Sequence, residues 1–167
     1  EKFKRGVIFC WWTGEELGLL GSAQYAKNPL IPFKQVVSYI NLDMVGRMKN
    51  NQLIMQGMGS SSVWKKMVEK RNVAAGFSLM LNNDPYQPTD ITSIYPKGVP
   101  SIALFTGLHK DYHKPTDDPD TLNYEGLERI TKFTGRLMMD MAGDMERPDY
   151  VKVERGNRGM ATRNSMK

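Results

Sequence analysis

Three largely apolar runs, rich in β-branched and aromatic residues, stand out along the chain. They cover residues 7–12, 36–42 and 99–106. A strand with one face in water alternates apolar and polar residues, and these runs do not, so they predict strands that are buried on both faces. Such strands are typical of a parallel sheet with helices on both sides.

Segments of helical periodicity lie between and after these runs. The apolar residues from Leu17 to Ala26 predict a first helix that packs back onto the sheet. The remaining pattern predicts helices over about 63–75, 90–95 and 124–142, and short strands over 52–58 and 77–81. Because strands and helices alternate, the expected fold is a three-layer α/β/α sandwich with a mainly parallel central sheet.

The composition is that of a globular domain. The chain has 167 residues, of which 40% are hydrophobic and 25% charged, and this is enough apolar material for a core. Since a buried strand starts only a few residues after Glu1, we expect the sheet to be incomplete at its N-terminal side. The single cysteine, Cys10, lies inside the first apolar run, so we expect it to pack in the core and to form no internal disulfide.

The formal net charge of +5 is concentrated at the C-terminus, where the last 13 residues carry four cations and no acid. We therefore predict a domain over residues 1–148 and a basic, flexible tail or linker over 149–167. The rest of the chain has no basic stripe with interleaved aromatic residues, so no nucleic-acid partner is expected. No apolar run approaches the roughly 20 residues that cross a bilayer, and no membrane partner is expected either.

Chemically active residues follow each of the three apolar runs. Glu15 and Glu16 come after the first run, Asp43 after the second, and both histidines, His109 and His113, after the third. Taken singly, these are ordinary surface acids, a turn-forming aspartate and solvated loop histidines. However, the carboxyl ends of parallel strands meet at one edge of a sheet, where ligands bind. Carboxylates and imidazole gathered at such an edge are typical of zinc sites.

Three stretches resemble successive motifs of a known family. They are Trp12-Thr-Gly-Glu-Glu-Leu-Gly-Leu-Leu-Gly-Ser22, Asn41-Leu-Asp-Met-Val-Gly46 and Gly107-Leu-His-Lys-Asp-Tyr-His-Lys-Pro-Thr-Asp117. In order and spacing they resemble the di-zinc aminopeptidase family that also contains the glutamate carboxypeptidases, peptidase family M28. The resemblance covers about residues 5–148 and implies a zinc-dependent exopeptidase, aminopeptidase-like, that hydrolyses peptide substrates.

The resemblance also implies a role for individual residues. Glu15 matches the general base, and Glu16 and Asp43 match ligands of one zinc ion. His113 matches a ligand of the second zinc ion, and Tyr112 matches a phenol that stabilises the tetrahedral intermediate. In the complete parent enzyme, two zinc ions would activate a water molecule for attack on the peptide carbonyl.

Two departures from the family pattern limit what this chain is expected to do. Many relatives read Ser-Asp-His where this chain has Thr89-Asp90-Ile91, so no role is expected for that segment, and none in metal binding for His109. The family's His-x-Asp motif and bridging aspartate lie upstream of the Glu-Glu loop, and the 14 residues before Glu15 contain neither His nor Asp. We therefore expect this chain to lack the N-terminal half of the catalytic domain, which would be its partner. Alone, the chain is expected to bind zinc weakly or not at all and to be inactive.

Two other functions fit the same motifs. The single-zinc glutaminyl cyclases also combine a Glu-Glu loop with a late histidine, and receptor relatives of this fold are non-catalytic binding domains. Cyclisation needs no attacking hydroxide, so substrate preference distinguishes a cyclase from a peptidase. The family resemblance favours a secreted or periplasmic location.

Overall fold

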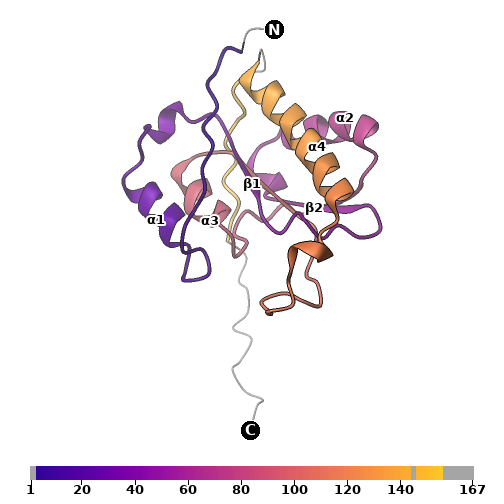
Figure 1. The fold of residues 1–167 in the computed structure, drawn as a ribbon. Coiled ribbons are helices and arrows are strands. Elements are labelled where there is room, and N and C mark those ends of the chain that lie inside the picture. Colours follow the sequence, from indigo (N-terminus) through magenta and orange to yellow (C-terminus); the bar gives the residue numbers. More distant parts are fainter. Residues whose placement is uncertain (1–2, 144–145, 156–167) are drawn as a thin grey trace.

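The fold of this chain, seen in a computed structural model, is built on a four-stranded sheet with helices on both sides (Figure 1). The structure describes residues 3–143 and 146–155. The helices are α1 (Leu20–Lys27), α2 (Trp64–Ala75), α3 (Ile91–Ile94) and α4 (Tyr124–Ala142), and the strands are β1 (Tyr39–Leu42), β2 (Gln52–Gln56), β3 (Ser78–Leu81) and β4 (Ser101–Phe105). Short 3-10 turns lie at Phe33–Gln35, Met58–Ser60, Tyr95–Lys97 and Pro119–Thr121.

The strand order of the sheet is β1-β4-β2-β3. Strand β1 runs parallel to β4, with Tyr39 opposite Ser101, and β2 runs parallel to β3, with Gln52 opposite Ser78. The central pair, β2 and β4, is antiparallel. The sheet is therefore mixed but mainly parallel, because two of its three pairings are parallel.

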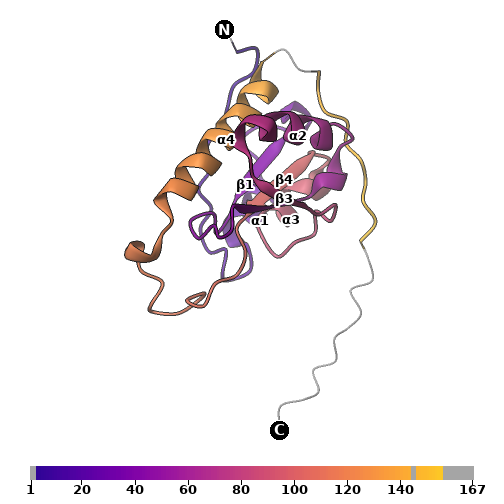
Figure 2. The same cartoon turned by 90° about the vertical axis from the view of Figure 1, so that its right-hand side faces the viewer.

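Helices α2 and α4 cover one face of the sheet, and α1 and α3 cover the other (Figures 1 and 2). The larger core lies under α2 and α4 and includes the fully buried Leu53, Leu104, Trp64 and Phe133. Smaller clusters on the other face are built around Ile94 and Val99 and around Ile91 and Tyr95. The predicted three-layer α/β/α sandwich is confirmed.

The start of α4 fixes the position of two loops. The Asn123 side chain accepts a hydrogen bond from the Gly126 amide at 2.8 Å, which caps the helix. The Asn123 backbone amide also donates to the Gly46 carbonyl at 2.8 Å, and its side-chain amide donates to the Met48 carbonyl at 2.9 Å. The loop after β1 and the loop before α4 are thus held together at one residue.

The prediction of a buried strand over residues 7–12 is wrong. Within the described ranges these residues pair with no strand, and their side chains are largely exposed, with Phe9 at 67% and Trp11 at 86%. Cys10 is exposed as well, which corrects its expected core position. A strand needs a partner on at least one edge to satisfy its backbone groups, and apolar character alone does not supply one.

Two further expectations for the N-terminal region need correction. The first helix begins at Leu20 and not near Leu17, and the side chains of both residues are mostly exposed. Strand β1, expected to be central, is the edge strand of the described sheet. The segment over 7–12 is instead anchored at its end by Trp12, whose Nε1 donates to the Tyr39 hydroxyl at 2.9 Å.

Residues 146–155 lie against the domain. Asp149 accepts hydrogen bonds from the Ser61 hydroxyl at 2.6 Å and the Ser62 amide at 3.0 Å, just before α2. The Val151 amide donates to the Ser60 carbonyl at 2.9 Å. Most of the predicted tail, residues 156–167, lies outside the described residues, so the boundary after residue 148 stays a prediction. No helix in the described part of the chain is long and apolar enough to cross a membrane.

Candidate metal centre

The loop that carries Glu15 and Glu16 is a tight turn closed by the first turn of α1. The Gly21 amide donates to the Thr13 carbonyl at 2.8 Å, and the Leu19 amide donates to the Glu15 carbonyl at 2.8 Å. Gly21 must stay a glycine, because a Cβ there would lie 2.7 Å from the Thr13 nitrogen. The close contact between the Gly21 and Thr13 backbones folds the intervening loop, so Glu15 and Glu16 lie directly after the extended segment that ends at Thr13.

Asp43 follows β1 directly and continues its pairing with β4. Its amide donates to the Leu104 carbonyl at 3.2 Å, and the next residue, Met44, has a φ of 49°. A left-handed backbone is uncommon for a residue with a side chain, and such conformations cluster at functional sites. The chain therefore turns sharply at the point where the Asp43 carboxylate leaves the sheet.

His113 reaches the Glu16 carboxylate across the site. Its Nε2 lies 2.8 Å from Glu16 Oε1. His113 also has a left-handed backbone, with a φ of 56°, a conformation that costs about 1–2 kcal/mol for an L-residue. The Tyr112 ring stacks on the His113 ring with centroids 3.8 Å apart. The nearly buried ring of His109 lies edge-on to the Tyr112 ring, and its Nε2 is 3.7 Å from Asp117 Oδ2.

The carboxylates crowd one another. Burial raises the pKa of Glu15, and the charges of Glu16, Asp43 and Asp90 raise it further, while His113 opposes them. Burial is also the main cause that raises the pKa of Asp43, followed by the charges of Asp90 and Glu16. Glu16 and His113 are in direct contact, and the charge effects indicate that Asp43 and Asp90 lie near the same carboxylates.

Asp90, for which the sequence indicated no role, belongs to this group. It lies directly before α3, is only 7% exposed, and its Oδ1 has no hydrogen-bond partner in the described part of the protein. A buried carboxylate oxygen without a partner is costly and points to a missing cation, proton or water. The resemblance did not assign it a role, because this chain has Thr89-Asp90-Ile91 where many relatives read Ser-Asp-His.

The donor types fit zinc, but they are too few for a complete site. Carboxylate oxygens and an imidazole nitrogen are ordinary zinc ligands, and a divalent cation would neutralise the crowded acids. Nevertheless, the residues that the structure describes contain no group of three His, Cys, Asp or Glu side chains arranged to hold one metal ion. Glu16 and Asp43 remain the candidates for one ion and His113 for another.

The crowded acids predict an unusual pH dependence of the metal-free chain. Because folding raises the pKa values of Glu15 and Asp43, it is opposed when both are ionised, and this opposition is relieved as pH falls through their folded pKa values. Hydrogen bonds from Ser61 and Ser62 lower the pKa of Asp149, so its ionised carboxylate stabilises the fold. This stabilisation is lost when Asp149 is protonated, below the ordinary carboxyl range of about pH 4. We expect the free energy of unfolding to increase as the pH is lowered from 7 and to be greatest just above the ordinary carboxyl range of about pH 4.

Denaturant titrations in the presence of a chelator measure this dependence. The double variant Glu15→Gln, Asp43→Asn is the control, since removing both charges should flatten the rise above pH 4. A free energy of unfolding that is highest at neutral pH and falls steadily with acidification would contradict the prediction.

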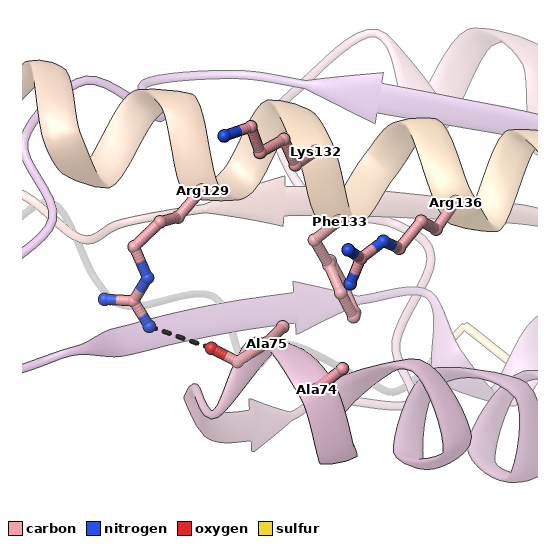
Figure 3. Close-up of a pocket in the computed structure, with 6 residues that line it drawn as sticks. All are labelled: Ala74, Ala75, Arg129, Lys132, Phe133 and Arg136. Atoms are coloured by element: carbon pink, nitrogen blue, oxygen red, sulfur yellow. Dashed lines mark hydrogen bonds between the residues drawn. The ribbon is translucent and has the colours of Figure 1, made fainter.

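A cleft between α2 and α4 does not coincide with this centre. It has a volume of about 120 Å³ and lies between the end of α2 and the middle of α4 (Figure 3). Its lining residues are Ala74, Ala75, Arg129, Lys132, Phe133 and Arg136. Arg129 already donates to the Ala75 carbonyl at 2.9 Å, and none of the acids or histidines of the candidate centre lines this cleft.

Sequence comparisons place the chain among peptidases. The sequence profile of Peptidase family M28 matches residues 1–138. Leucine aminopeptidase 2 of Arthroderma otae is 26% identical over 193 residues, which cover 96% of this chain and 39% of that protein. The probable leucine aminopeptidase 2 of Aspergillus fumigatus is 32% identical over 163 residues, with 78% of this chain and 32% of that protein covered.

Solved structures share the same fold. The LapA aminopeptidase of Legionella pneumophila matches with a TM-score of 0.73 at 20% identity, over 87% of this chain and 42% of LapA. BSAP, a zinc aminopeptidase from Bacillus subtilis, matches with a TM-score of 0.66 at 23% identity, over 85% of this chain and 37% of BSAP. The chain thus spans less than half the length of these relatives. Because the family profile covers most of its 167 residues, the chain belongs to peptidase family M28.

Proposed function

We propose that this chain supplies part of the active site of a zinc-dependent aminopeptidase. The observation that carries the proposal is the convergence of the acidic loops with the His113 loop, where Glu16 and His113 come within 2.8 Å of each other. Relatives that are named leucine aminopeptidases support an aminopeptidase in preference to a glutaminyl cyclase or a binding domain. The substrates would be peptides with an apolar N-terminal residue such as leucine.

Each residue of the centre has a distinct part in this proposal. Glu16 and Asp43 would hold one zinc ion and His113 the other. Bound zinc supplies Lewis acidity, which lowers the pKa of a water molecule toward neutrality. Glu15 would accept a proton from that water and return it to the leaving amine. The Tyr112 hydroxyl would donate a hydrogen bond to the oxyanion as it forms.

The remaining ligands would come from a further part of the peptidase. The exposed segment over residues 7–12 is the surface proposed to receive it. In the described structure this segment is extended and apolar, its backbone makes no hydrogen bond to another strand, and Ile8 and Phe9 are more than half exposed. A neighbouring strand would satisfy those backbone groups and cover the apolar side chains.

An assay with two substrates tests the proposal. The complete peptidase, meaning this chain together with the part that supplies the remaining ligands, should hydrolyse a leucyl anilide. It should lose this activity to a zinc chelator and regain it with added zinc. It should leave an N-terminal glutaminyl peptide uncyclised. The variants Glu16→Ala and Asp43→Ala should contain less zinc than the unaltered enzyme, measured by atomic absorption. Cyclisation of the glutaminyl peptide without anilide hydrolysis would overturn the assignment.

A further inference from the structure

Arg47 connects the loop after β1 to the loop that carries His113. Its guanidinium donates from Nη2 to Asp111 Oδ2 at 2.6 Å and from Nη1 to Asp117 Oδ1 at 2.7 Å. Nη1 also contacts the Thr121 hydroxyl in the turn before α4. The side chains of Arg47 and Asp111 are each only 10% exposed, so this ion pair is well shielded from water. The Arg47 guanidinium therefore binds the His113 loop, residues 107–121, at three positions.

The two carboxylates that bind Arg47 flank His113. Asp111 precedes it by two residues, and Asp117 follows it by four. The Thr116 hydroxyl adds a hydrogen bond to Asp111 Oδ1 at 2.9 Å. The Arg47 hydrogen bond, followed by that of Thr116, holds the pKa of Asp111 below its usual range. The loop is therefore fixed on both sides of the histidine by charge-assisted hydrogen bonds, which are the strong ones.

Few other contacts hold this loop. Of residues 107–121, all of which the structure describes, only Asp111 and the ring of His109 are buried. The apolar side chains that could anchor the loop do not, since Leu108 is 71% exposed and Tyr112 38%. His113 also has a left-handed φ of 56°, which a free loop would relax. The position of His113 thus depends largely on polar contacts, and those of the flanking Asp111 and Asp117 meet at Arg47.

We propose that Arg47 is a positioning residue of the candidate metal centre. By binding Asp111 and Asp117, it holds the His113 imidazole within 2.8 Å of the Glu16 carboxylate. The site is thereby preorganised before any ligand arrives, which is how rigid supporting contacts raise metal affinity and activity. The catalytic consequence rests on the proposed function, whereas the effect on the loop does not.

The loop can be measured in the chain without any assay of activity. The chain has only two histidines, so histidine-labelled protein gives two sets of ring signals in NMR spectra. Amide exchange at Lys114 and Asp117, which donate backbone hydrogen bonds within the loop, reports its order. In Arg47→Ala we expect the His113 signals to shift and exchange at these amides to accelerate about tenfold or more. Amides of β4 should keep their protection.

Matched variants separate positioning from general loss of stability. Arg71 forms a similar ion pair with Asp140, between α2 and α4, so Arg71→Ala should leave the His113 loop unchanged. Arg47→Lys should restore the loop only in part, because one ammonium group does not reproduce the fork of a guanidinium. If Arg47→Ala does not fold, Asp117→Asn removes one contact at a more exposed position and should give a smaller change of the same kind.

Zinc content and turnover of the complete peptidase provide the second readout. Arg47→Ala should lower zinc affinity or kcat about 10- to 100-fold, the usual effect of losing an outer contact, and Arg71→Ala should not. Unchanged His113 signals and amide exchange in both Arg47→Ala and Asp117→Asn would overturn the proposal. A loosened loop with unchanged zinc affinity and turnover would overturn it too. A peptidase that turns over normally with Glu15→Gln would refute the proposed function while leaving the loop result valid.

Discussion

Replacing Glu15 with glutamine in the complete peptidase is expected to lower kcat by about 10²- to 10⁴-fold and to leave the zinc content unchanged. Glutamine has the shape of glutamate but cannot accept a proton. In the structure His113 contacts Glu16, and the neighbouring Glu15 is the carboxylate proposed for proton transfer. In the metal-free chain burial raises the pKa of Glu15, and the neighbouring Glu16, Asp43 and Asp90 raise it further.

Two comparisons make this result specific. Glu16→Gln should lower zinc content as well as kcat, because Glu16 is assigned as a ligand. Glu128→Gln is the matched control, since Glu128 is an exposed glutamate that pairs with Lys132 on the outside of α4. If Glu15→Gln kept more than about a tenth of the unaltered kcat, the assignment of general base would be wrong.

The 167-residue chain by itself is expected to bind zinc weakly and to show no measurable peptidase activity. A catalytic zinc ion normally has three protein ligands and an open position. This chain offers Glu16 and Asp43 to one ion and His113 to the other, so both sites are short of ligands. Asp111 and His109, in the same loop as His113, do not supply the missing zinc ligands. Asp111 is bound by Arg47, and the His109 ring is buried beside Asp117.

Calorimetric titration of zinc into the purified chain, with a leucyl anilide assay alongside, measures both parts of this expectation. A protein that contains the complete family domain serves as the positive control for the assay. Tight binding of two zinc ions together with turnover would contradict the prediction. It would mean that a second copy of the chain, or Asp90 with its unpartnered oxygen, completes the site.

Most of the fold could be predicted from the sequence because it depends on local patterns. Helix α4 begins and ends where its periodicity indicated, at Tyr124 and Ala142, since one apolar stripe and an Asn123 cap are sufficient to define it. Strand β4 lies inside the predicted apolar run over 99–106 for a similar reason. The order of the motifs along the chain was likewise enough to identify the family.

Tertiary structure alone decided which apolar residues are buried and which polar residues meet. The run over 7–12 reads as a core strand, yet Trp11 is 86% exposed, because burial depends on a neighbouring strand that no local pattern reveals. Arg47 lies 64 residues from Asp111 in sequence, and Asp90 lies far in sequence from Glu15, whose pKa it raises, so neither interaction leaves a periodic signal. The sequence determined which elements form and which chemistry they carry. The packing of distant loops against one another determined how those residues are held, because only the folded chain sets distances between them.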